Sequence, residues 1–134
     1  MGSSRRIRVA LAGLVALVLV GWFVRGLAVD EEPVLPGADS GLPVRALSDL
    51  PQEAEGTWRR IERGGPFPHD EDGTVFGNRE RLLPSEGSAY YREYTVATPG
   101  SEDRGARRLV TGREGELYYT EDHYESFVVV DPER

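Results

Sequence analysis

The 134-residue chain contains no cysteine and no lysine, and its only histidines are His69 and His123. Without cysteine it can form no disulfide bond, so its stability must come from a hydrophobic core that is large enough for one domain of modest size. The two histidines lie far apart in the sequence, and the acidic run 70–72 does not have the spacing of a calcium-binding loop. We therefore predict neither a metal site nor a cofactor.

The first 28 residues have the pattern of a targeting segment. Three arginines within the first eight residues precede an uncharged apolar run from Val9 to Val24, as in the charged and hydrophobic regions of a signal peptide. Two alternatives stay open: a signal peptide cleaved after Ala28, or an uncleaved signal anchor that meets the membrane through residues 7–28. Both alternatives place the remainder outside the cytoplasm, as a secreted or membrane-anchored protein.

The acidic residues all follow this segment. Beyond Ala28 there are twelve basic and 23 acidic residues, a formal balance of −11. Proteins that coat nucleic acid are usually basic overall, so this composition argues against a protein that coats polyanions and for a low background affinity. Any RNA chemistry must therefore use a local cationic site within an acidic body.

The pattern beyond the targeting segment predicts a linker and one domain. Residues 29–43 are rich in Pro, Gly and acidic residues, which is typical of a linker. The domain is expected over residues 44–134. Its first element should be a helix with Ser48 and Asp49 as N-cap residues, an apolar stripe, and an end at Gly64-Gly65.

Five short runs of apolar, aromatic and β-branched residues follow, joined by turns with no helix between them. The predicted strands are 74–76, 90–96, 107–111, 116–119 and 127–130. Strands joined in this way form an antiparallel meander. The fold class is therefore α+β, with an N-terminal helix packed on one face of an antiparallel β-sheet and the other face left for a site.

One residue in the second predicted strand does not fit a purely structural role. Glu93 lies mid-strand, where a carboxylate usually points into solvent. The next strand begins with a group of arginines, Arg104, Arg107 and Arg108, and His123 follows later in the sequence. Arg107 should point to the opposite face from Arg108, so a surface role remains open for it. A carboxylate, a guanidinium cluster and a histidine on one sheet face would supply the base, anion clamp and acid for phosphate chemistry.

A set of short blocks between Leu42 and Asp131 resembles, in content and order, the small secreted bacterial guanyl-preferring ribonucleases, the microbial ribonuclease family that includes barnase. The blocks are Gly65-Pro66-Phe67-Pro68, Asp72-Gly73, Val75-Phe76, Asn78-Arg79-Glu80, Tyr90-Tyr91-Arg92-Glu93-Tyr94-Thr95-Val96, Thr98-Pro99-Gly100, Arg104-Gly105, Arg107-Arg108, Thr111-Gly112 and Asp122-His123-Tyr124. The resemblance implies the microbial ribonuclease fold and an endoribonuclease that cleaves single-stranded RNA after guanosine.

The resemblance also implies the catalytic roles. Glu93 would take the proton from the ribose 2′-hydroxyl, His123 would protonate the departing 5′-oxygen, and Arg104 and Arg108 would bind the phosphate. The first step would leave a 2′,3′-cyclic phosphate. In a slower second step Glu93 and His123 would exchange roles while water opens the ring to a 3′-phosphate.

The implied guanine-binding residues are Phe76, Gly77, Asn78, Arg79, Glu80 and Tyr124. Glu80 would accept hydrogen bonds from guanine N1–H and the exocyclic amine, and backbone N–H groups of the 77–79 segment would donate to O6. Phe76 and Tyr124 would stack on the two faces of the base. Phe76 has a core role as its alternative, and Gly77 stands where close relatives carry a polar side chain, which would loosen the base contacts.

The resemblance implies single-stranded RNA as the partner, a small intracellular protein inhibitor as a candidate partner, and a monomer. Two alternatives to an enzyme remain: a catalytically silent RNA- or inhibitor-binding module with the same fold, and an extracytoplasmic scaffold. The complete set of Glu93, Arg108 and His123 favours the enzyme over the silent module. The arginine cluster inside an acidic domain argues against the scaffold.

Overall fold

The computed structural model describes residues 33–134. The predicted signal peptide or anchor, residues 1–28, lies outside the described residues, and so do residues 29–32 of the predicted linker. Within residues 33–134 no helix has the length and apolar character needed to cross a membrane.

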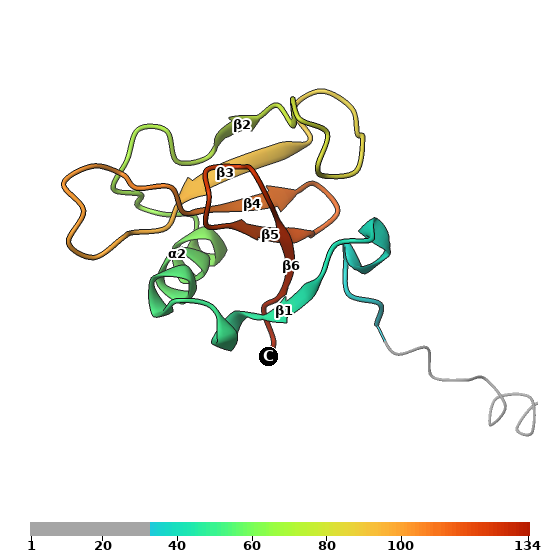
Figure 1. Cartoon of the computed structure of the whole chain (residues 1–134), viewed down its shortest axis with the longest axis horizontal. Coiled ribbons are helices and arrows are strands. Elements are labelled where there is room, and N and C mark those ends of the chain that lie inside the picture. Colours follow the sequence, from blue (N-terminus) through green and yellow to red (C-terminus); the bar gives the residue numbers. More distant parts are fainter. Residues whose placement is uncertain (1–32) are drawn as a thin grey trace, which may run out of the picture. The chain divides into compact units, whose positions relative to one another are not determined.

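One six-stranded sheet organises these residues, with the strand order β1-β6-β5-β4-β3-β2 (Figure 1). The strands are β1 (Val44–Ala46), β2 (Thr74–Phe76), β3 (Tyr91–Thr95), β4 (Arg108–Gly112), β5 (Leu117–Thr120) and β6 (Val128–Asp131). The antiparallel meander from β2 to β6 was predicted and is confirmed. The sequence did not predict β1, which pairs in parallel with β6 at one edge, because three residues after a Pro/Gly-rich stretch carry no readable alternation.

Helix α2 (Gln52–Arg63) packs on one face of the sheet, as predicted (Figure 1). Its stop signal is confirmed, since Gly64 adopts a left-handed conformation with φ 79°. Its predicted start is wrong. Ser48 and Asp49 lie in a preceding 3₁₀ turn, η2 (Leu47–Asp49), and the N-cap residue is Pro51, which makes no side-chain cap.

Alternation along the strands divides the core into two apolar clusters, one on each face of the sheet. The cluster under α2 contains Leu47, Leu50, Ala54, Val96, Leu109, Leu117, Tyr119 and Val130. The cluster on the opposite face contains Leu83, Tyr91, Val110, Tyr118, Phe127 and Val129. The two clusters leave the sheet buried on both faces, and the second one forms the floor of the candidate site.

The described part of the predicted linker, residues 33–43, is folded onto this second cluster instead. Leu35 and Leu42 pack against it, and the short 3₁₀ turn η1 (Ala38–Ser40) lies between two glycines with positive φ. The carbonyl of Pro43 accepts a hydrogen bond from the Val129 amide in β6. Two leucines are enough to anchor a segment whose composition otherwise favours a linker.

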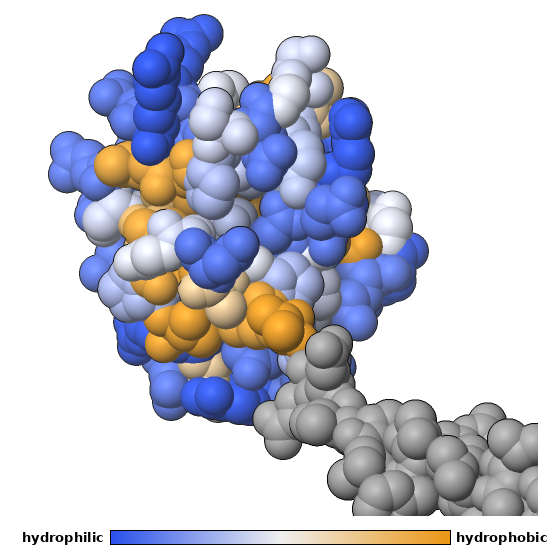
Figure 2. Space-filling view, turned by 90° about the vertical axis from the view of Figure 1, so that its right-hand side faces the viewer, coloured by the Kyte–Doolittle hydropathy of each residue, from blue (hydrophilic) through white to orange (hydrophobic). Residues whose placement is uncertain are grey.

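Seen from the right-hand side of Figure 1, the surface is mostly hydrophilic, with apolar side chains gathered in patches among charged ones (Figure 2). The exposed large apolar residues are Val34, Val44, Val75 and Leu82. Val75 and Leu82 both border the cleft described next.

Candidate active site

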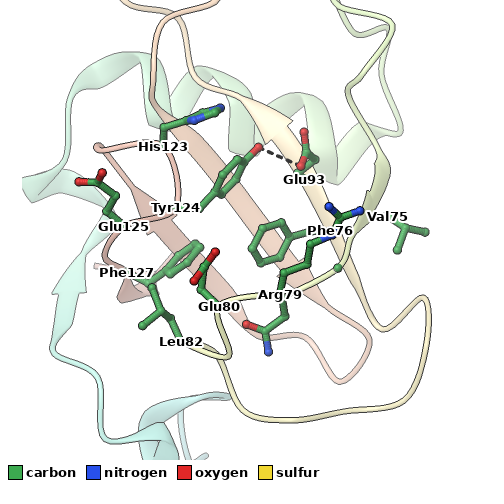
Figure 3. A pocket seen from close by; sticks show the side chains of 12 residues that line it. Val75, Phe76, Arg79, Glu80, Leu82, Glu93, His123, Tyr124, Glu125 and Phe127 are labelled. Atoms are coloured by element: carbon green, nitrogen blue, oxygen red, sulfur yellow. Dashed lines mark hydrogen bonds between the residues drawn. The ribbon is translucent and has the colours of Figure 1, made fainter.

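A cleft of about 760 Å³ opens on the sheet face opposite α2 (Figure 3). It is lined by β2, the loop that follows it, the middle of β3 and the 123–127 loop. Of the predicted site residues it gathers Phe76, Gly77, Asn78, Arg79, Glu80, Glu93, His123 and Tyr124. Four further lining residues, Val75, Leu82, Glu125 and Phe127, were not predicted, because the blocks of the resemblance gave them no role.

Glu93 is held in the cleft by contacts on both of its carboxylate oxygens. Its side chain is 16% exposed and lies in β3 opposite Val110 of β4. One carboxylate oxygen lies 3.7 Å from Arg104 Nη2, and the other accepts a hydrogen bond of 2.9 Å from the Tyr124 hydroxyl. The carboxylate is therefore held between a guanidinium and a phenol. Burial raises the pKa of Tyr124 to about 12, and the bond to Glu93 adds to the rise.

Arg104 reaches Glu93 from the loop before β4. Its Nε and Nη2 both donate to Thr95 Oγ1, at 3.2 and 3.0 Å, which fixes the guanidinium against the end of β3. The next residue, Gly105, has φ 66° and lies so close to the Thr98 side chain that any Cβ would clash. The loop therefore requires glycine here to bring Arg104 to the site.

Arg104 has a second acidic neighbour, Glu71, which belongs to the acidic run 70–72. Glu71 Oε2 lies 3.7 Å from Arg104 Nε, and the Glu71 side chain is 53% exposed. Nothing in the local sequence indicates this contact, since the two residues come from different loops. An anion that binds Arg104 must compete with Glu71.

Arg108 is buried and is not among the residues that line the cleft. It is 2% exposed, and its Nη1 donates to the carbonyls of Gly105 and Arg107. Its charge nevertheless acts on the site, because it lowers the pKa of Tyr124 against the effect of burial. Arg107 acts on the other face, where it partly offsets the rise that burial causes in the pKa of Tyr119, in agreement with its predicted alternation away from Arg108.

His123 and Tyr124 are presented by a tight loop in which both have positive φ, 55° and 73°. The His123 amide donates to the Ala106 carbonyl, which ties this loop to the arginine loop. Thr120 Oγ1 accepts a hydrogen bond from the Tyr124 amide and donates to Asp122 Oδ1. The backbone thus holds His123 at the rim, where its ring is exposed.

The loop after β2 is shaped by Asn78. Its side-chain amide donates to the Leu83 carbonyl at 2.9 Å and its oxygen accepts from the Leu83 amide at 3.1 Å, so this side chain closes the loop. Asn78 itself has φ 49°, a conformation that asparagine tolerates. A Cβ at Gly77 would make only ordinary contacts with the Arg79 side chain, so the missing side chain there is not imposed by space.

The predicted base sandwich is not open in this structure. The rings of Phe76 and Tyr124 stack directly on each other, with centroids 4.9 Å apart and an interplanar angle of 28°. A base between them would need a separation of about 7–8 Å, two contact distances. In Figure 3 the two rings lie between Glu93 and His123 on one side and Glu80 on the other. Phe76 also packs against the Phe127 ring, so it belongs to both core and cleft.

Residues 33–134 contain no group of three or more His, Cys, Asp or Glu side chains that could hold a metal ion. The cleft presents the Glu93 carboxylate and the His123 imidazole, with the Arg104 guanidinium beside Glu93 and the buried Arg108 outside the lining. Together these groups can move protons and bind an anion.

The comparisons with known proteins agree with this description. A ribonuclease family model matches residues 36–131. Guanyl-specific ribonuclease St from Saccharopolyspora erythraea is 59% identical over 91 residues, which cover 68% of this chain and 90% of that protein. Guanyl-specific ribonuclease Sa from Kitasatospora aureofaciens is 52% identical over 86 residues, 63% of this chain and 90% of that protein.

Among solved structures, ribonuclease Sa2 with guanosine-2′-cyclophosphate superimposes with a TM-score of 0.67 at 47% identity and covers 70% of this chain and all of that one. The complex of ribonuclease Sa2 with 3′-GMP gives a TM-score of 0.65 at 45% identity, over 69% of this chain. The resemblance in the sequence is thereby confirmed over the domain. The chain belongs to the family of microbial guanyl-specific ribonucleases.

Proposed function

We propose that the protein cleaves single-stranded RNA on the 3′ side of guanosine, first to a 2′,3′-cyclic phosphate and then, more slowly, to the 3′-phosphate. The observation that carries the proposal is the Glu93 carboxylate, held beside Arg104 in the cleft that also contains His123 and Glu80. The relatives named guanyl-specific ribonucleases support it. The need for a ribose 2′-hydroxyl excludes DNA as a substrate.

In the first step Glu93 takes the proton of the 2′-hydroxyl, whose oxygen attacks phosphorus while the bond from phosphorus to O5′ breaks. His123 gives its proton to O5′. Arg104 stabilises the charge that builds on the phosphoryl oxygens, and its planar guanidinium matches two such oxygens at once. Arg108 is buried and does not line the cleft, so it adds to this stabilisation through its charge. In the second step His123 takes a proton from water, whose oxygen attacks phosphorus while the bond from phosphorus to O2′ breaks, and Glu93 returns its proton to O2′. Each proton move therefore uses a side chain of this domain.

Binding of guanine must open the stacked pair of aromatic rings. We propose that Tyr124 moves off Phe76 so that the base enters between them, and that its hydroxyl then gives up the bond to Glu93, which frees that carboxylate for the 2′-hydroxyl. The free enzyme would thus keep its general base occupied until substrate arrives. The stack of 4.9 Å and the 2.9 Å hydrogen bond support this order of events.

The decisive assay compares GpC and ApC dinucleotides in the presence of a chelator. Guanosine 2′,3′-cyclic phosphate formed from GpC, with much slower cleavage of ApC, would support reaction type, base preference and independence from metal. A folded sample that cleaves neither dinucleotide would contradict the proposal and favour a silent binding module.

Replacing Glu80 with alanine is expected to reduce discrimination between GpC and ApC. Glu80 lines the cleft and is exposed in the free protein, so its loss should leave the fold unchanged. A bidentate contact to a base edge is worth about 1–3 kcal/mol, and kcat/KM for GpC should therefore fall about 5- to 150-fold while that for ApC changes little. Equal losses on both substrates would remove Glu80 from base recognition.

Replacing Glu71 with glutamine is expected to strengthen binding of 3′-GMP. The carboxylate competes for Arg104 at the solvent-exposed edge of the site, and an exposed ion pair is worth about 0.2–1 kcal/mol, so the Kd should fall about 1.5- to 5-fold at low salt. Glu62→Gln on the exposed side of α2 changes the net charge equally and serves as the control. A Kd that responds to both changes alike would mean that only net charge matters.

We further propose that the domain acts outside the cytoplasm, delivered by residues 1–28. The supporting observation is the separation of charge along the sequence, with every acidic residue beyond Ala28. Fractionation of the producing cells, with antibody against the domain, tests it, and a purely cytoplasmic signal would contradict it.

A further inference from the structure

A second cleft, of about 290 Å³, shares no lining residue with the candidate active site. Its lining includes four carboxylates and two phenols, which belong to Asp39, Glu86, Glu114, Glu116, Tyr90 and Tyr118. They come from the segment around η1, the end of the loop after β2, and the β4–β5 turn. Figure 1 shows η1 beside that turn. Three separate segments thus present acidic groups to one open cleft.

Two of these side chains carry buried polar atoms without a partner. Glu116 is 8% exposed and Tyr118 is fully buried, yet Glu116 Oε1 and the Tyr118 hydroxyl make no hydrogen bond within residues 33–134. Leaving such groups unsatisfied in the interior costs free energy of folding. Both atoms are almost inaccessible in the free protein, so a ligand in the cleft would recover that cost only if the two side chains turned toward it.

The local backbone is shaped around these two groups. Gly112 leaves the space that the Glu116 carboxylate occupies, since any Cβ there would clash with it. A Cβ on Gly37 would lie 3.0 Å from the Tyr118 hydroxyl. Burial raises the pKa of Tyr90 to about 12, and Glu116 adds to the rise through a hydrogen bond and its negative charge.

The acidic lining of the cleft favours a cationic ligand. No basic residue lines it, and none of its four carboxylates forms an ion pair within the described part of the chain. The carboxylates do not converge as metal ligands, since no such cluster exists in residues 33–134. A guanidinium carries five N–H donors in a planar fork and can reach acceptors on several sides, whereas an ammonium acts as a compact point charge.

We propose that this cleft binds a guanidinium group, with Glu116 and Tyr118 as the buried acceptors and Asp39, Glu86 and Glu114 as the acidic rim. The group would come from an arginine side chain of a polypeptide or from a small guanidino compound. The site is separate from the proposed catalytic chemistry and does not depend on it.

The test is a titration of the full-length, isotope-labelled protein with Nα-acetyl-arginine amide, followed by amide NMR. Saturable shifts are expected at residues 36–40 and 112–118. Nα-acetyl-lysine amide carries the same net charge and should bind at least 10-fold more weakly. A Gly-Arg-Gly peptide blocked at both ends separates the sources: binding as tight as the single residue indicates a polypeptide ligand, and much weaker binding indicates a small guanidino compound.

Two variants keep the proposal falsifiable. Glu116→Gln removes a buried charge that has no ion-pair partner, so the variant should fold with at least the wild-type unfolding temperature. It should bind the arginine derivative at least 10-fold more weakly and cleave GpC at the wild-type rate. Glu62→Gln, with the same change in net charge, should bind normally. Absence of saturable shifts, equal binding of the lysine derivative, or unchanged affinity in Glu116→Gln would each overturn the proposal.

Discussion

Replacing Glu93 with glutamine is expected to lower kcat/KM for GpC by about 100- to 10,000-fold, the range of a positioned general base. Glutamine has nearly the same shape and can still accept the hydrogen bond from Tyr124, but it cannot take a proton from the 2′-hydroxyl. The ion pair with Arg104 is lost as well, yet that guanidinium keeps both hydrogen bonds to Thr95. The fold and the position of Arg104 should therefore persist.

Steady-state kinetics on GpC, with thermal unfolding measured in parallel, check this expectation. The matched control is Glu125→Gln, because Glu125 lines the same cleft, is exposed, and loses the same charge. Its kcat/KM should stay within a few-fold of the wild type. Activity of Glu93→Gln close to that of Glu125→Gln would show that Glu93 only contributes charge and that another group takes the proton.

The sequence could predict on which face of the sheet each strand residue of the site lies. The register pairs Glu93 with Val110 and Thr95 with Arg108, so the carboxylate and the buried arginine share a face as the period of two requires. The same period separates the two core clusters, and it places Arg107 toward Tyr119 on the helix face. These conclusions need only local sequence and a correct assignment of strands.

Contacts between loops could not be predicted in this way. The pairing of Glu71 with Arg104 and the stacking of Tyr124 on Phe76 join segments that are 33 and 48 positions apart in the sequence. Such contacts depend on the exact backbone of two loops, here set by positive φ at Gly105, His123 and Tyr124. The same limit explains why the parallel strand β1 was missed, since its partner β6 lies at the other end of the domain.

The acidic residues around Arg104 affect how strongly the protein attracts RNA. Arg104 lies within 3.7 Å of two carboxylates, those of Glu71 and Glu93. These neighbours neutralise its charge in the free protein and weaken its pull on distant polyanions. A phosphate must displace part of this network, so retention of RNA depends on contacts made in the cleft, including the base contacts, more than on overall charge.

Replacing His123 with asparagine is expected to lower kcat/KM for GpC by about 100- to 10,000-fold, because no other group would protonate the departing O5′. Asparagine tolerates the positive φ of this position, and the hydrogen bond to the Ala106 carbonyl uses the backbone amide. The His123 side chain is exposed. The loop should therefore keep its conformation, which thermal unfolding of the variant would verify.

A substrate with a better leaving group distinguishes the general acid, His123, from the general base, Glu93. A guanosine 3′-aryl phosphate releases a phenolate that needs little protonation, so His123→Asn should regain most of its lost activity on this substrate, while Glu93→Gln should not. Both variants are assayed on GpC and on the aryl ester under the same conditions. An equal loss of His123→Asn activity on the two substrates would exclude proton donation to the leaving group and leave His123 a positioning role only.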